Sequence, residues 1–211
     1  MTISIRGPLA ALVLSAALAP AASRAQVPRT PITSAADLSP QERDMLALAN
    51  DFARRCAEVI DRWLADKEVT EDRLFASLYY PVPATDPPKY HTDWDQLSDR
   101  DVQPIEEAIL ARSSTIVFAV LVDRHGYLPT HDLRYSLPLT GNLASDLVNN
   151  RTKRIFDDRT GLAAARSDAP FLVQRYQRDT GETMEDLSVP VTIRGRHWGA
   201  VRIGFRQADT R

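Results

Sequence analysis

The chain has 211 residues, of which 44% are apolar and 26% are charged, and its formal net charge is −2. These values are typical of one globular domain with accessory segments, and they exclude a strongly basic surface of the kind that binds nucleic acid. The one cysteine, Cys56, excludes an intramolecular disulfide and a metal site built from four cysteines.

The first 25 residues are expected to be a secretion signal. Arg6 precedes an apolar run over 8–19, and Ser23–Ala25 offers small residues where a signal peptidase cuts, which predicts cleavage before Gln26. The mature protein is then expected in the periplasm, and losing Arg6 and Arg24 changes the net charge from −2 to −4. A retained membrane anchor is the alternative, although the run is shorter than the ~20 residues of a spanning helix.

A flexible lead-in over 26–38 is predicted to precede a long helix. Ser39 is a good N-cap, and Glu42 three residues later completes a capping box. Apolar residues then recur at steps of four and three in one stripe: Met45, Ala49, Phe52, Cys56, Val59 and Trp63. We expect this stripe to lie on a sheet, with Cys56 as a buried apolar residue. A homodimer seam is the alternative, and a helix of this length could serve both purposes.

Two further helices are predicted, at 70–78 and from about 102 to 111. Between them, the segment 79–91 contains four prolines and is expected to be an extended excursion over the surface. A short helical piece is expected around 142–148 and another at 161–166.

The stretch 116–131, IVFAVLVDRHGYLPTH, predicts a strand, a tight turn and a second strand. Gly126 can take the positive φ that such a turn needs. The first strand is apolar on both faces, so we expect it to be buried at the centre of a sheet. Pro129 donates no hydrogen bond and places the second strand at an edge.

Three final strands are predicted at 171–178, 184–193 and 197–206, and their short connections favour an antiparallel meander. Alternation along the last two strands gives one apolar face, expected to lie under the long helix: Leu187, Val189, Val191, Ile193, Val201, Ile203 and Phe205. The opposite face is polar or small, and loops are expected to cover it: Asp186, Ser188, Pro190, Trp198, Ala200, Arg202 and Gly204.

The predicted fold class is α+β. An antiparallel sheet of about five strands carries the long N-terminal helix on one face, with loops and short helices on the other. The range 39–211 is expected to form one domain, with its N-terminal helices at 39–79 and its sheet region at 80–206.

Five segments taken in order, TDPPKYHT, FAVLVDRHGYLPTH, NRTKRIFDD, RDTGETMEDLSVP and GRHWGAVRIGF, resemble the PAS-like, Cache-type sensing domain of bacterial methyl-accepting chemotaxis proteins. The resemblance covers about 80–205 and implies ligand sensing rather than catalysis. The chain departs from those receptors because it has no HAMP segment and no long signalling coiled coil, so a separate membrane signalling protein is expected to carry the signal. It also lacks the Cys-x-x-Cys-His motif that attaches haem covalently, and no cofactor is expected.

We expect a small anionic or zwitterionic ligand, a carboxylate or an amino acid, to bind between the polar sheet face and the loops. Strand alternation places Tyr127 with His131, and an enclosed arginine needs a carboxylate partner from the protein or the ligand. The candidate ligand-binding residues are Tyr127, His131, Arg154, Asp157, Tyr176, Asp186 and Arg202. In the alternative interpretation, the arginines pair only with the aspartates and no cavity exists.

The residues also bear on three other functions: metal binding, catalysis and a scaffold role. The four histidines, His91, His125, His131 and His197, are scattered without the spacing of metal ligands, so a zinc or copper site would have to be assembled by the fold. No metal ligands are assigned, and a periplasmic metal-binding protein is left as an alternative. His131, Asp157, Asp158 and Ser188 are the candidate catalytic groups, but no nucleophile elbow, phosphate loop or metalloprotease helix accompanies them. We therefore do not expect an enzyme. A scaffold without a ligand remains a further alternative.

Overall fold

The structure is a computed structural model that describes residues 31–177 and 183–207. The predicted signal sequence with its cleavage point before Gln26, and the predicted turn at 179–182, lie outside the described residues. The described helices are η1 (Ala35–Asp37), α1 (Pro40–Ala65), α2 (Glu71–Phe75), α3 (Asp95–Asp101), α4 (Gln103–Leu110), η2 (Leu133–Tyr135), α5 (Leu143–Asn149) and α6 (Arg159–Arg166). The described strands are β1 (Tyr80–Pro81), β2 (Tyr90–His91), β3 (Ile116–Asp123), β4 (Tyr127–Leu128), β5 (Arg154–Ile155), β6 (Leu172–Gln177), β7 (Thr183–Ile193) and β8 (Arg196–Phe205).

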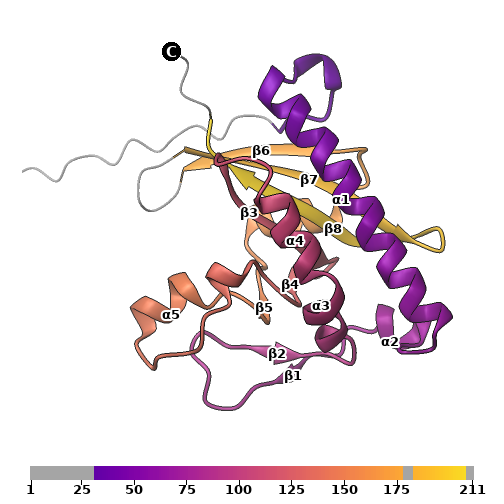
Figure 1. The fold of residues 1–211 in the computed structure, drawn as a ribbon, viewed down its shortest axis with the longest axis vertical. Helices are drawn as coiled ribbons and strands as arrows, with labels where there is room; N and C mark the ends of the chain where they lie inside the picture. Colours follow the sequence, from indigo (N-terminus) through magenta and orange to yellow (C-terminus); the bar gives the residue numbers. More distant parts are fainter. Residues whose placement is uncertain (1–30, 178–182, 208–211) are drawn as a thin grey trace, which may run out of the picture.

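Four antiparallel strands form the main sheet, in the order β3-β8-β7-β6 (Figure 1). The α+β class is therefore confirmed, and so is the meander of β6, β7 and β8. The sheet has four strands where about five were expected. The second strand of the predicted hairpin, β4, pairs instead with β5 in a separate two-stranded sheet, and β1 pairs with β2 in another.

Helix α1 lies across one face of the main sheet (Figure 1). The capping box is present, because Ser39 Oγ accepts a hydrogen bond from Glu42 N and Glu42 Oε2 accepts one from Ser39 N. The predicted stripe is buried in one core with the apolar face of β7 and β8, and Phe52 and Cys56 are fully buried. Because the sheet of the same chain covers this stripe, it is not an open homodimer seam.

Strand β3 is an outer strand of the sheet rather than a central one, which corrects the sequence-based expectation. Its apolar side chains are nevertheless buried on both faces. The free edge of β3 is covered by helix α4 and by the segment 130–136. Two of its backbone N–H groups donate to buried carboxyls, Ala119 to Asp132 at 3.2 Å and Leu121 to Glu106 at 3.0 Å.

Trp198 lies on the helix side of the sheet, although alternation along β8 predicted it on the polar face. In the pairing of β7 with β8, Val191 is opposite Gly199 and Thr192 is opposite His197, so Trp198 is an extra residue without a partner. Such a β-bulge interrupts the alternation and re-aims a side chain, here that of Trp198. The ring therefore packs against Trp94, with a centroid distance of 5.2 Å, and joins the main core.

Smaller differences concern the N-terminal segments. The lead-in is anchored at Ile32, whose N–H and carbonyl both bond with Val173 at 3.0 and 2.9 Å. Helix α2 is shorter than predicted, and α3 precedes the predicted third helix, α4. No helix within the described ranges is long and apolar enough to cross a membrane.

Candidate functional site

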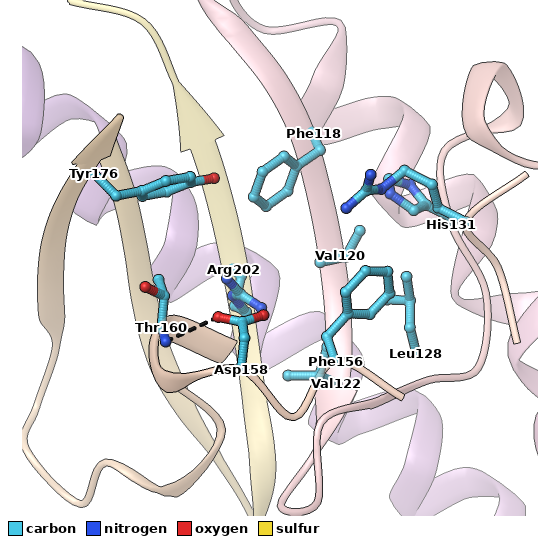
Figure 2. A pocket seen from close by; sticks show the side chains of 11 residues that line it. Phe118, Val120, Val122, Leu128, His131, Phe156, Asp158, Thr160, Tyr176 and Arg202 are labelled. Atoms are coloured by element: carbon cyan, nitrogen blue, oxygen red, sulfur yellow. Dashed lines mark hydrogen bonds between the residues drawn. The ribbon is translucent and has the colours of Figure 1, made fainter. Parts of the chain in front are cut away.

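A cavity of about 250 Å³ lies between the main sheet and the loops on the face opposite α1 (Figure 2). Strands β3, β8 and β6 supply one side of it, and the segments after β4 and before α6 supply the other. The lining residues are Phe118, Val120, Val122, Leu128, His131, Arg151, Phe156, Asp158, Thr160, Tyr176 and Arg202.

The apolar part of the wall comes mainly from β3. Val120 and Val122 are buried and form a second core cluster with Leu128, while the ring of Phe118 packs against this cluster. Gly204 on the neighbouring strand makes room for that ring, because a Cβ at this position would overlap the Phe118 side chain. This glycine therefore fixes where the aromatic wall of the cavity can lie.

Arg202 and Asp186 form a buried ion pair at the base of the cavity. Arg202 Nε lies 3.1 Å from Asp186 Oδ2, and the Arg202 guanidinium contacts the same oxygen with a second nitrogen. Asp186 is fully buried and does not line the cavity. Burial disfavours the charge on Arg202, but Asp186 outweighs it, so the pKa of Arg202 is raised above its ordinary value.

His131 is the most enclosed polar group of the wall, with only 3% of its surface exposed. Burial, together with the charges of Arg151, Arg134 and Arg202, holds its pKa well below the ordinary value, so the imidazole is neutral. Its Nδ1 is 3.3 Å from Asp132 Oδ2 but is not aligned for a hydrogen bond, and no described group satisfies it. A buried polar atom without a partner is a candidate contact for a ligand or a water.

The opposite wall is built around the start of α6. Asp158 is the N-cap of this helix, and its Oδ1 accepts hydrogen bonds from Thr160 N at 2.9 Å and Gly161 N at 3.0 Å. Next to it, the Phe156 ring carries two guanidinium groups, Arg151 at 5.0 Å and Arg154 at 4.9 Å from the ring centroid. The cavity thus has cationic groups on several sides and one carboxylate at its rim.

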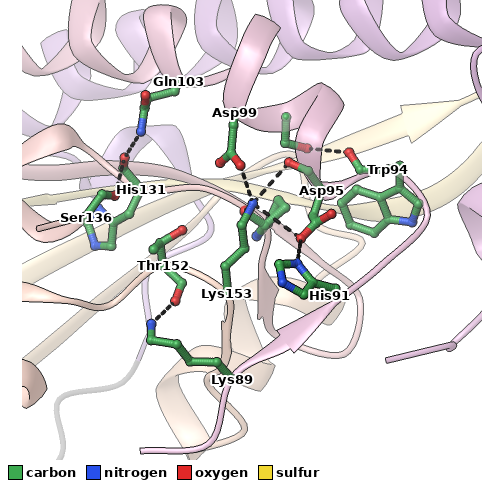
Figure 3. Close-up of polar contacts among 12 residues, drawn as sticks. Lys89, His91, Trp94, Asp95, Asp99, Gln103, His131, Ser136, Thr152 and Lys153 are labelled. Carbon is green, nitrogen blue, oxygen red and sulfur yellow. Dashed lines mark hydrogen bonds and ion pairs between the residues drawn. The ribbon is translucent and has the colours of Figure 1, made fainter. Parts of the chain in front are cut away.

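A second hollow of about 320 Å³ lies beside β2 and α3 and is strongly polar. In it, Asp95 Oδ2 is 2.6 Å from His91 Nδ1 and 3.4 Å from Lys153 Nζ, a group outside the lining that also contacts Asp99 Oδ2 at 2.6 Å (Figure 3). The remaining carboxylates, Glu68 and Asp93, are bonded to arginines. Every carboxylate here is therefore neutralised, and no group of described residues has the arrangement of a metal site.

Comparison with known proteins leaves the family open. No family model matches the sequence, and no curated protein matches it. Among solved structures, an extracellular ligand-binding receptor from Desulfohalobium retbaense DSM5692 is similar over 80% of this chain, with 15% sequence identity and a TM-score of 0.34. The chain spans 26% of the length of that receptor. A likeness this weak carries no conclusion about function, which therefore depends on the geometry of the site.

The structure brings together three of the seven sequence-predicted site residues: His131, Tyr176 and Arg202 line the cavity. Asp186 lies behind the wall as the partner of Arg202. The other three residues are placed elsewhere.

Tyr127 lies in the main core, not with His131. Its ring packs against Trp94 at 5.8 Å between centroids, and its hydroxyl donates to the carbonyl oxygen of Tyr90 at 2.8 Å. The predicted alternation does not reach His131 because β4 ends at Leu128, immediately before the proline.

Arg154 and Asp157 do not line the cavity either. Arg154 stacks on Phe156, and burial, followed by the charge of Arg151, lowers its pKa to about 10. Asp157 is exposed, and it is the next residue, Asp158, that lines the cavity and caps α6.

Sequence reasoning missed eight lining residues: Phe118, Val120, Val122, Leu128, Arg151, Phe156, Asp158 and Thr160. Phe118, Val120 and Val122 share one face of β3. This strand was correctly expected to be buried on both faces, so its alternation could have identified them as lining residues. Asp158 precedes a short helix and has the side chain of a good N-cap. Nothing in the sequence around Arg151 indicates that its side chain lines the cavity.

Proposed function

We propose that this chain is a small-molecule sensing domain that binds an anionic or zwitterionic ligand, a carboxylate or an amino acid, in the sheet-and-loop cavity. The observation that carries the proposal is a preformed cavity with an apolar wall, into which a neutral buried histidine and fixed arginines converge. Ligand sites generally combine such apolar walls with a few placed polar groups.

The charges around the cavity favour a ligand with a negative group. His131 is surrounded by the positive charges of Arg151, Arg134 and Arg202, and the Arg202 guanidinium is paired with Asp186. A ligand carboxylate near His131 would meet Arg151, while an ammonium group would be favoured next to Asp158 at the opposite rim. The volume of about 250 Å³ is at the low end for ligand sites, which favours a small metabolite.

The wider role rests on the sequence. The segments that resemble Cache-type sensors support sensing, and the apolar run after Arg6 supports export to the periplasm with cleavage before Gln26. We infer that the signal passes to a separate membrane signalling protein. Catalysis is not part of the proposal, since the buried Ser188 hydroxyl bonds to the Leu172 carbonyl oxygen at 3.5 Å rather than to a base.

The first test is a thermal-shift screen of the mature protein with carboxylates, amino acids, amines and divalent metal ions. A ligand that binds the native state alone raises the melting temperature by mass action, so carboxylates or amino acids should raise it. If none does, while an amine or metal ion does, the ligand class is wrong. If nothing shifts the melting temperature, the scaffold without a ligand is supported.

The second test uses calorimetry with the best ligand and two matched variants. Arg151→Ala removes the cavity-lining guanidinium that stacks on Phe156 and should weaken binding by roughly 1.5–3 kcal/mol, the worth of a charge-assisted hydrogen bond. Arg154→Ala removes the other guanidinium on the same Phe156 ring, outside the lining, and should change the affinity much less. Equal losses in both variants, or none in Arg151→Ala, would contradict the site.

A further inference from the structure

Two buried carboxyl groups cover the outer edge of β3, and the cavity does not use them. Asp132 Oδ2 accepts a hydrogen bond from Ala119 N, and Glu106 Oε1 accepts one from Leu121 N. Both acids are fully buried. N–H groups two residues apart on a strand point to the same edge, so the two carboxyls are neighbours along it.

In each of these carboxyl groups, one oxygen accepts a hydrogen bond and the other has no hydrogen-bond partner. Glu106 Oε2 and Asp132 Oδ1 are buried and have no hydrogen-bond partner within the described ranges. An ionised carboxylate would place uncompensated charge on those oxygens, whereas a carboxylic acid places a neutral O–H there and keeps the other oxygen as an acceptor. The geometry therefore suits the protonated form.

The charges around the two carboxyl groups also favour their protonated forms. Glu106 is faced by Cys56 from α1, Asp99 from α3, Glu107 from α4 and Asp132. Asp132 is faced by the neutral His131 and by Arg134 from η2. Burial, and then Asp132, raises the pKa of Glu106 well above its ordinary value. Burial raises the pKa of Asp132 to about 7, with Ala119 N–H and Arg134 opposing it.

These acids also fix one wall of the cavity. Asp132 directly follows His131, and the segment 130–136 is joined to α4 by two further bonds. Gln103 Nε2 donates to the His131 carbonyl oxygen at 2.9 Å (Figure 3), and Leu133 N donates to Glu107 Oε1 at 2.6 Å. A change at Asp132 is therefore transmitted to His131 through one peptide bond.

We propose that Glu106 and Asp132 form a proton-dependent clamp that positions the His131 wall. With a proton on each acid, the segment 130–136 lies closed on the edge of β3. Loss of the proton from Asp132 places one buried negative charge beside the still protonated Glu106, and the segment, which is not part of the sheet, moves toward water. Glu106 and Asp132 are positioning residues that act through His131. The clamp itself does not require a ligand, whereas any effect on affinity rests on the proposed function.

The sign of the pH effect follows from the shift at Asp132. Its pKa in the folded protein is about 7, whereas the pKa of an aspartate in the unfolded chain is ~3.9. The folded state therefore binds more protons than the unfolded state between these values, and stability falls as pH rises through this window. At pH values above this window, Asp132 is ionised in both states, so the free energy of unfolding stays at its lower value.

The test compares melting temperatures from pH 4.5 to 8.5 in the whole chain and two variants. The unmodified protein should melt at progressively lower temperature as pH rises toward 7. Asp132→Asn keeps an oxygen for Ala119 N and carries no charge at any pH, so the slope should fall by the share of Asp132, while the share of Glu106, whose pKa is also raised, remains. Asp146→Asn is the matched control: Asp146 is also buried, but hydrogen bonds from Thr140 and Gly141 lower its pKa, so the slope should remain.

Two further readouts separate a clamp from a merely structural residue. Infrared spectra at pH 6 should contain the carbonyl stretch of a buried protonated carboxyl, and Asp132→Asn should remove part of it. The protection of the Ala119 and Leu121 amides against hydrogen exchange should fall as pH rises through 7 in the unmodified protein alone. If Asp132→Asn does not fold, Glu106→Gln takes its place. An unchanged slope in the variant, or no protonated carboxyl at pH 6, would overturn the clamp, and neither outcome depends on whether a ligand binds.

Discussion

At the scale of single residues, the pair Arg202–Asp186 has two roles beside the cavity. Asp186 is fully buried, and Arg202 supplies its charge partner from the neighbouring strand. The same guanidinium faces the cavity, so it can contact a ligand only with donors that Asp186 leaves unused. Removing Arg202 therefore affects stability first, and it is a poor probe of binding.

We expect Arg202→Met to lower the free energy of unfolding by about 3–5 kcal/mol, because it leaves the Asp186 carboxylate buried without a partner. The double variant Arg202→Met, Asp186→Leu replaces the pair with apolar groups of similar volume and should recover most of that loss. Urea denaturation measures both. A single variant as stable as the parent would show that water reaches Asp186.

At the scale of elements, helix α1 shows what local sequence can establish. Its start was predicted from Ser39 and Glu42, which bond to each other across three residues, and its buried face from a spacing that depends only on helical geometry. The alternation of β7 was predicted for the same reason. These predictions were correct because the residues that determine such features are close together in the sequence.

The elements that were misplaced depend on distant partners. Nothing within β3 shows that β8, about 80 residues later, pairs with one edge while Glu106 and Asp132 cover the other. Trp198 changes sides because of a mismatch with β7, and Tyr127 is carried into the core by a strand that ends one residue later. At the site, the strand residues Arg202 and Tyr176 were therefore predicted, whereas the loop residue Arg151 was not.

Phe52→Ala should lower the free energy of unfolding by about 3–5 kcal/mol, because the fully buried ring leaves a cavity between α1 and the sheet. Chemical denaturation measures the loss. Glu58→Ala, on the exposed face of the same helix, is the control and should stay within about 0.5 kcal/mol of the parent. A loss below about 1 kcal/mol at Phe52 would mean that α1 does not pack on the sheet in solution.

At the scale of the whole molecule, β8 is the strand on which the sheet depends. It pairs with β3 on one side and with β7 on the other, and its side chains contribute to both the main core and the cavity. Without it, β3 has no partner in the main sheet, and β7 keeps only β6.

A chain that stops after Arg194 should therefore fail to form the native fold, whereas one that stops after Gln207 should form it. Circular dichroism and resistance to limited proteolysis distinguish the two. A protease-resistant core in the shorter chain would show that α1 and β7 fold without the central strand.

The position of β8 also constrains how the protein can be synthesised. Residues 116–122, IVFAVLV, leave the ribosome about 80 residues before the strand that pairs with them. During that interval the nascent chain presents an uncharged, strongly β-forming segment with an open edge, the kind of segment that aggregates with other copies. We expect newly made chains to need a chaperone that covers this segment until residues 196–205 arrive.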